Sequence, residues 1–363
     1  MNKNTYCVIM AGGLGTGFWP VSRSDYPKQF IDILGTGETL LQQTFHRFNQ
    51  LVPQENILIV TNERYKNLVE EQLPEIHHSQ LLLEPSRRNT APCLAYAGYK
   101  INDINPNANI IVAPSDHIIT KEQNFLNTIQ EALEVTAEHQ WILTLGLSPL
   151  RAETEYGYIQ YVDQEPLTDN ERIYKVRTFT EKPDKDMAEK FIESGDFLWN
   201  SGIFVASLNT WLEALKKYLP DMYNTFNNGI GRYNTSDEAS FVRSAYTVCK
   251  NISIDYGIME KADNTYVYSS SFGWSDLGTW DALHNSLKKD KTGNSLIGGK
   301  IKTYDTTNCI VNMPKEKLVV LQGLENFIIA EDHNALMICQ REKEGMIRRF
   351  INDIKLDNGK QYI

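Results

Sequence analysis

The sequence lacks the features of a secreted, disulfide-bonded protein. Its five cysteines are dispersed and form no C-x-x-C pair: Cys7, Cys93, Cys249, Cys309 and Cys339. An odd number of dispersed thiols suits a reducing compartment, and we interpret these thiols as structural. The polar start MNKNTYCVIMAGG leaves no room for the apolar segment of a signal peptide. These absences predict a cytoplasmic location.

Long apolar runs and an excess of positive charge are also missing. No apolar run approaches the roughly 18 residues that a membrane-spanning helix needs. The 36 lysine and arginine residues are outnumbered by 46 aspartate and glutamate residues, which gives a net charge of −10. That charge argues against nucleic-acid polymers and membranes as partners. An anionic substrate would have to be held by local cations or by a metal ion.

Hydrophobic periodicity predicts an α/β protein. The 363 residues are 41% hydrophobic and 23% charged, which suits a globular protein of about two domains. Apolar runs of strand length alternate with helical patterns: strands at 6–10, 56–60, 81–83, 109–112 and 141–145, helices at 39–51, 65–73, 91–102 and 121–139. This order predicts a Rossmann-like, mixed, mostly parallel sheet with helices on both faces.

The periodicity changes near residue 286. Short apolar runs separated by turns predict strands at 295–301, 309–313, 318–321, 327–330 and 335–339, followed by a closing helix at 342–354. We therefore expect a domain at 1–285 and a small β-rich domain at 286–363.

A glycine-rich loop follows the first predicted strand. Four glycines remove side chains that would keep backbone N–H groups away from a polyanion: Gly12, Gly13, Gly15 and Gly17. The spacing G-G-L-G-T-G fits neither G-x-G-x-x-G nor a P-loop. A tight turn would explain the glycines equally well, but it does not need the Trp19-Pro20, Arg23 and Lys28 that follow. We interpret the loop as a phosphate site.

Two further segments follow predicted strands. For EPSRRNTAP at 84–92, a helix cap at Asn89 or Thr90 is the simpler explanation when the Asn-Thr pair is taken alone. In Pro114-Ser-Asp-His117, the aspartate stands where a strand ends and is well placed to hold Mg²⁺. Asp116 is therefore a candidate metal ligand, and we interpret His117 as a structural hydrogen-bonding residue.

Seven motifs in order resemble those of the sugar-1-phosphate nucleotidylyltransferases: residues 7–30, 84–92, 114–117, 155–159, 178–183, 199–204 and 273–280. The F-W-P-x-S-R-x-x-x-P-K-Q-F version of the loop resembles the mannose-1-phosphate guanylyltransferase branch. The resemblance implies a nucleotidyltransferase catalytic domain at 1–285 and a β-helix-like domain at 286–363 that is often used in dimer contact, hence a homodimer. The implied transferase reaction converts GTP and α-D-mannose 1-phosphate into GDP-mannose and diphosphate.

The resemblance also implies the roles of individual residues. The nucleotide would be bound by Ala11, Gly12, Gly13, Gly15, Thr16, Arg88, Asn89 and Thr90. The sugar phosphate would be bound by Gly157, Glu181, Lys182, Asn200 and Ser201. The catalytic residues would be Arg23, Lys28, Asp116 and Asp276, of which the two aspartates would hold Mg²⁺.

Some of these residues have simpler explanations when each motif is taken alone. Gly157 could mark a strand bulge, and Glu181-Lys182-Pro183 could be a charged turn. Asp255 and Tyr256 either support the sugar site or serve in capping and packing.

One position departs from the family pattern. The family carries arginine before F-W-P, where the guanidinium would brace the triphosphate, and here the residue is Gly17. This departure leaves open a low-activity sensor that binds sugar nucleotides. Another hexose-1-phosphate nucleotidylyltransferase also stays open, because the choice of base and hexose depends on a few hydrogen bonds.

Overall fold

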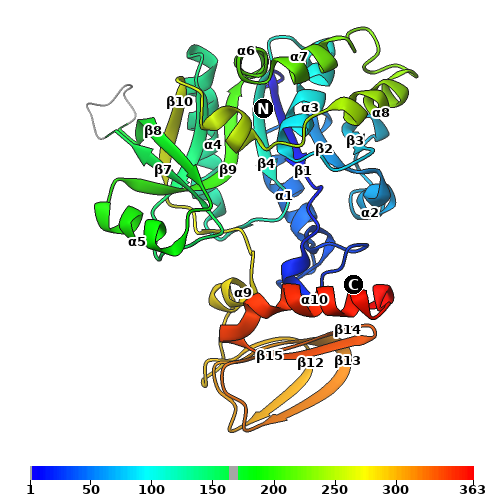
Figure 1. Ribbon diagram of the computed structural model, residues 1–363, viewed down its shortest axis with the longest axis vertical. Coiled ribbons are helices and arrows are strands. Elements are labelled where there is room, and N and C mark those ends of the chain that lie inside the picture. Colours follow the sequence, from blue (N-terminus) through cyan, green and yellow to red (C-terminus); the bar gives the residue numbers. More distant parts are fainter. Residues whose placement is uncertain (1, 163–170) are drawn as a thin grey trace. The chain divides into compact units, whose positions relative to one another are not determined.

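The computed structural model describes residues 2–162 and 171–363 (Figure 1). The chain forms two compact units. The large unit comprises the described residues of Met1–Gly12, Thr44–Ser115 and Ile119–Trp274, and the small unit comprises Gly13–Gln43, Asp116–Ile118 and Ser275–Ile363. Because the units are interleaved along the chain, the domain boundary expected at residues 285 and 286 stays a prediction.

The large unit is built on a nine-stranded mixed sheet in the order β3-β2-β1-β4-β9-β6-β10-β8-β7, with β7 also paired to β9. Its strands are β1 (Thr5–Met10), β2 (Ile57–Asn62), β3 (Leu81–Glu84), β4 (Asn109–Pro114), β6 (Ile142–Leu147), β7 (Gly157–Tyr161), β8 (Ile173–Glu181), β9 (Phe197–Ser207) and β10 (Thr265–Ser270). The strands β1 to β4 pair in parallel, as do β6 and β10. The strands β7, β8 and β9 make antiparallel pairs. The expected mixed sheet is confirmed.

Helices cover the sheet of the large unit. They are α2 (Lys66–Gln72), α3 (Thr90–Ile104), α4 (Glu122–Glu138), α5 (Lys185–Ser194), α6 (Leu208–Tyr218), α7 (Pro220–Asn227) and α8 (Glu238–Val248). Alternate residues of β1 show that both faces of the sheet are covered. Tyr6 and Val8 belong to a core that includes much of α3, while Cys7 and Ile9 point to the opposite face and are fully buried. Three elements lie where the chain passes between the units: α1 (Leu40–Phe48), β5 (Ile118–Ile119) and β11 (Trp274–Ser275).

The small unit contains the expected β-rich region. Its sheet has the order β12-β13-β14-β15, formed by β12 (Ser295–Tyr304), β13 (Ile310–Gln322), β14 (Phe327–Asp332) and β15 (Ala335–Gln340). The helix α10 (Ile347–Leu356) lies across this sheet and buries Ile347 and Ile351 in a core shared with Ile310 and Ile328 (Figure 1). A shorter helix, α9 (Trp280–Ser286), adds Trp280, whose ring meets Phe18 edge to face.

We find no helix in residues 2–162 and 171–363 that combines the length and the apolar character of a membrane span.

Candidate active site

The carboxyl end of β1 leads into the glycine loop. The Ala11 backbone is held on both sides, because its N–H donates to the Val60 carbonyl and its own carbonyl accepts from the Thr61 hydroxyl, each at 2.7 Å. A Cβ on Gly12 would stand 3.2 Å from Oε2 of Glu84, which is tighter than most side-chain contacts. Glycine at position 12 therefore lets the loop pass close to the Glu84 carboxylate.

Glu84 ends β3 and is a buried residue that the sequence analysis did not select. Its Oε1 accepts hydrogen bonds from the Cys93 thiol at 3.1 Å and from the Tyr246 hydroxyl at 2.9 Å. Burial raises the pKa of Glu84, while these two hydrogen bonds and the charge of Arg87 oppose the rise. The sequence signal that could have identified Glu84 is its position directly after the apolar run at 81–83.

Arg88 and Asn89 lie in the loop between β3 and α3, and Thr90 begins α3. Asn89 is the N-cap of α3, because its side chain accepts from the Thr90 N–H at 3.0 Å. The Thr90 hydroxyl accepts from the Ile254 N–H at 2.8 Å, and Arg88 Nε donates to the Tyr246 carbonyl at 3.2 Å. The capping role weighed from the sequence is thus present at Asn89, and the nucleotide contacts of all three residues stay predictions.

A second cluster in the large unit joins β7, β8 and β9 to the π-helical turn Asp255–Met259. Gly157 and Glu181 are partners on β7 and β8, and a Cβ on Gly157 would be 2.4 Å from Glu181 Oε2. The Asn200 amide donates to Asp255 Oδ1 at 3.0 Å, and Lys182 Nζ lies 3.5 Å from Glu181 Oε1. The structure therefore gathers most of the predicted sugar-phosphate residues, together with Asp255.

The two carboxyl groups of this cluster affect each other. Burial and then the negative charge of Asp255 raise the pKa of Glu181 to about 7, although Lys182 opposes the rise. Burial also raises the pKa of Asp255, against hydrogen bonds from its own backbone and from Asn200 and Ser253. Glu181 consequently changes charge near neutral pH.

The remaining predicted sugar residue, Ser201, is buried beside Asn200. Its hydroxyl accepts from the Ile203 N–H at 3.2 Å, which holds the backbone of β9 in place. A direct contact between Ser201 and the sugar stays a prediction.

Lys28 is the centre of a charged cluster in the small unit. Its Nζ lies 3.0 Å from Asp116 Oδ2, and it donates to the backbone carbonyls of Asp276 at 2.6 Å and Leu277 at 3.1 Å. Burial by itself would raise the pKa of Asp116, but the charges of Lys28 and His117 outweigh it and lower the pKa. The structure thus brings together three of the predicted catalytic residues.

The donor set of this cluster fits a magnesium ion. The Asp116 carboxylate contacts Lys28 directly, and Asp276 reaches the same lysine through its backbone carbonyl. Carboxylate oxygens are hard donors, and Mg²⁺ is commonly held by one or two of them together with substrate phosphates. Within residues 2–162 and 171–363, no three His, Cys, Asp or Glu side chains are grouped as a complete metal site. A magnesium site shared by Asp116 and Asp276 therefore stays a prediction.

Arg23 is engaged elsewhere in the small unit. Its guanidinium donates to the backbone carbonyls of Asp332 at 2.7 Å and Gln361 at 3.3 Å, to Asn334 Oδ1 at 2.9 Å and to the Pro20 carbonyl at 3.1 Å. These bonds hold the turn between β14 and β15 and the last residues of the chain. The predicted catalytic role of Arg23 stays a prediction.

The glycines of the loop differ in what surrounds them. Gly15 has φ +56°, and its Cβ would be 2.7 Å from the Lys28 backbone nitrogen. A Cβ on Gly13 would meet nothing within 4 Å, whereas one on Gly17 would stand 2.4 Å from the Gly278 carbonyl oxygen. The side chain of Thr16 lies outside the described part of the chain.

A family model described as nucleotidyl transferase matches residues 6–293. The chain belongs to the nucleotidyl transferase family. This result confirms the family resemblance read from the ordered motifs and agrees with the mixed sheet of the large unit.

Named relatives are similar to this nucleotidyl transferase over nearly its whole chain. Mannose-1-phosphate guanylyltransferase 2 of Escherichia coli O157:H7 is 36% identical over 98% of this chain and 74% of its own length. Mannose-1-phosphate guanylyltransferase of Klebsiella pneumoniae is 34% identical over 98% of this chain and 75% of its own length. A solved structure from Thermus thermophilus, described as a mannose-1-phosphate geranyltransferase, superposes with a TM-score of 0.87 and 30% identity over 97% of this chain and 99% of its own.

Proposed function

We propose that this nucleotidyl transferase is a mannose-1-phosphate guanylyltransferase, which converts GTP and α-D-mannose 1-phosphate into GDP-mannose and diphosphate. The observation that carries the proposal is the similarity over 98% of the chain to guanylyltransferases of E. coli and K. pneumoniae. The same similarity favours this activity over a different hexose-1-phosphate nucleotidylyltransferase and over a sugar-nucleotide sensor.

In the proposed reaction, a phosphate oxygen of mannose 1-phosphate attacks the α-phosphorus of GTP in line. A new oxygen–phosphorus bond forms, and the bond from the α-phosphorus to the departing diphosphate breaks. The attacking oxygen is already ionised, so the chain needs no general base. Its task is to position the substrates and to stabilise the charge that moves to diphosphate, for which we assign the Lys28 ammonium and the backbone N–H groups of residues 12–15.

We assign the metal site to Asp116 and Asp276. A bound Mg²⁺ ion would neutralise phosphate charge and hold the phosphate oxygens in place. Lys28 supports this site from the protein side, because its charge lowers the pKa of Asp116 and keeps that carboxylate ionised. Its two hydrogen bonds to the backbone carbonyls of Asp276 and Leu277 fix the segment that carries the second carboxylate.

Guanine recognition is assigned to Glu84. Guanine presents two adjacent N–H donors on its pairing edge, N1–H and the 2-amino group, and a carboxylate accepts such donors. Oε1 of Glu84 is oriented by Cys93 and Tyr246, while Oε2 faces Gly12 of the loop. This arrangement supports a preference for GTP, since ATP lacks both donors.

The mannose ring is assigned to Glu181 and Asn200, and its phosphate to Lys182. The two oxygens of Glu181 and the amide of Asn200 provide the acceptors and donors that sugar hydroxyls need. The Lys182 side chain is half-exposed, so its ammonium group can turn from Glu181 to an incoming phosphate.

The activity is tested by measuring diphosphate release with GTP, ATP, UTP and CTP against mannose 1-phosphate and glucose 1-phosphate. We expect GTP with mannose 1-phosphate to exceed every other pair by roughly tenfold or more in kcat/KM. Glu84→Gln should reduce kcat/KM for GTP by about tenfold or more, because one oxygen becomes an amide donor that opposes guanine. Glu70→Gln on the exposed side of α2 is the matched control. Tight GDP-mannose binding without diphosphate release would contradict the proposed activity.

We also propose that the enzyme is a homodimer that works in the cytoplasm. The small unit supports self-association, because Leu318, Val320, Leu336 and Ile338 on its sheet each expose more than half of their side chains. Light scattering coupled to gel filtration measures the mass in solution, and a monomer at micromolar concentration would reject the dimer.

A further inference from the structure

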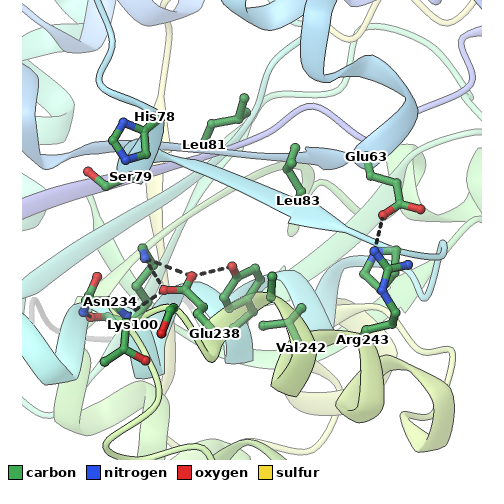
Figure 2. Close-up of a pocket in the computed structure, with 15 residues that line it drawn as sticks. Glu63, His78, Ser79, Leu81, Leu83, Lys100, Asn234, Glu238, Val242 and Arg243 are labelled. Carbon is green, nitrogen blue, oxygen red and sulfur yellow. Dashed lines mark hydrogen bonds and ion pairs between the residues drawn. The ribbon is translucent and has the colours of Figure 1, made fainter.

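The large unit contains a cavity of about 520 Å³ that none of the proposed catalytic roles uses. It lies between β3 and α8, with Lys100 of α3 at one end and the Glu63–Arg243 ion pair at the other (Figure 2). A volume of this size is ordinary for a small-molecule site. The cavity is therefore large enough to bind a metabolite.

The walls of the cavity combine an apolar surface with charged groups. Leu81 and Leu83 of β3 and Val242 of α8 supply the apolar part. A molecule with an apolar body can bury surface against these three side chains. The charged groups at the two ends decide which polar group the molecule should carry.

At the Lys100 end of the cavity, the negative charge of Glu238 is already balanced by hydrogen bonds. The Glu238 carboxylate accepts two hydrogen bonds from Lys100, at 2.6 and 2.9 Å, one from the Tyr96 hydroxyl at 2.6 Å and one from the Asn234 N–H at 2.6 Å. At the other end, the bond from Arg243 to Glu63 at 3.0 Å uses one of the five N–H donors of the guanidinium. Lys100 is thus paired with Glu238, whereas the Arg243 guanidinium keeps N–H donors beyond the one that bonds Glu63, which favours an anionic group at that end of the ligand.

The helix α8 connects this cavity to the proposed guanine site. Val242 and Arg243 face the cavity, and Tyr246 stands one turn further along the same helix, where its hydroxyl donates to Glu84 at 2.9 Å. The strand β3 makes a second connection, since Leu83 lines the cavity and the next residue is Glu84. A ligand that fills the space between α8 and β3 would fix Tyr246 relative to Glu84.

We propose that the cavity is an effector site for a small molecule with an apolar body and one anionic group, either a carboxylate or a phosphate. Its occupancy raises the affinity for GTP, because it orders α8 against β3 in the arrangement that orients Glu84. The effect on GTP rests on the proposed function, whereas the binding site itself does not.

The binding site is tested with 8-anilinonaphthalene-1-sulfonate, an apolar aromatic molecule with one anionic group, by its fluorescence under direct excitation. We expect saturable binding of one dye per chain to the full-length protein. Ala239→Trp places a large ring in the cavity from an exposed position of α8 and should weaken the dye by about tenfold or more. Ser240→Trp, at the next exposed position and outside the cavity lining, is the matched control. Equal dye binding by Ala239→Trp and the wild type would overturn the site.

The ligand chemistry is tested by displacing the dye with phenyl phosphate, benzoate and benzyl alcohol. Displacement by either anion at concentrations at which benzyl alcohol is ineffective supports an anion-selective site, and the stronger anion identifies the group. Arg243→Gln should remove this selectivity. Equal displacement by the neutral alcohol would overturn the anionic assignment.

The coupling is tested by titrating GTP with and without saturating dye. We expect the dye to lower the Kd for GTP by about fivefold in the wild type and to leave it unchanged in Ala239→Trp. An unchanged Kd in the wild type, with dye bound, would overturn the regulatory part. A protein that binds the dye but neither binds GTP nor releases diphosphate would instead reject the proposed function.

Discussion

Glu181→Gln is expected to stabilise the large unit at pH 8 much more than at pH 5. Glu181 stands beside Asp255, and burial together with that neighbouring charge raises its pKa from 4.5 to about 7. In the unfolded chain the same carboxyl group ionises near its ordinary pKa. The folded protein therefore binds more protons than the unfolded chain between these two values.

The sign of the pH dependence follows from this difference. Because the folded-state pKa is raised, the contribution of Glu181 is fully present below about pH 4.5 and is lost as the pH rises through about 7. A pKa difference of this size corresponds to about 3 kcal/mol of unfolding free energy. Glutamine stays neutral at every pH, so the variant avoids this loss.

The assay is thermal unfolding of wild type and variant at pH 5 and pH 8. Most of the difference falls inside this interval, and we expect the Tm advantage of Glu181→Gln to grow by about 4 °C or more from pH 5 to pH 8. Glu189→Gln is the control, since Glu189 is a half-exposed residue of α5 that pairs with Lys185. Identical pH profiles for Glu181→Gln and wild type would refute the reasoning, because Glu181 would then ionise as it does in water.

Three further predictions concern the proposed reaction and the loop. Asp276→Asn should lower kcat by roughly a hundredfold or more with unchanged circular dichroism, and a near-normal rate would remove Asp276 from the mechanism. Lys182→Ala should raise KM for mannose 1-phosphate much more than KM for GTP, whereas equal changes would reject its assignment to the sugar phosphate. Gly17→Ala should cost about 1–3 kcal/mol of stability, because its Cβ would stand 2.4 Å from the Gly278 carbonyl oxygen. Gly13→Ala has nothing within 4 Å and is its control, so equal Tm values for the two variants would contradict the contact.

Local apolar patterns predicted strands β1 to β4 and β6 of the large unit, together with helices α2, α3 and α4. The runs at 6–10 and 109–112 lie in β1 and β4, and the run at 56–60 overlaps β2 from residue 57, because each strand is almost wholly buried and carries few polar residues. In the small unit, the separate strands expected at 309–313 and 318–321 are one strand, β13. The intervening Lys315 to Lys317 are exposed on that strand, and their polarity resembles that of a turn.

The sequence did not predict which parts of the candidate site contact one another. The approach of Gly157 to Glu181 depends on the antiparallel register of β7 and β8, and the contact of Asn200 with Asp255 joins segments 55 residues apart. Neither contact produces a recognisable pattern in the sequence around the residues involved. The same reason applies to Glu84, whose partner Tyr246 is 162 residues away.

Gly17 is better explained by a backbone contact than by a lost cation. Its backbone lies outside the left-handed region, so the conformation does not require glycine, but the Gly278 carbonyl leaves no room for a Cβ. The same segment, residues 276–278, includes Asp276, and the backbone carbonyls of Asp276 and Leu277 accept hydrogen bonds from Lys28. Any side chain at position 17 would push this segment away and disturb the lysine and the carboxylate together. Gly17→Arg therefore changes the geometry of the proposed phosphate site as well as its charge, and a loss of activity in that variant would be no evidence against phosphate binding by the loop.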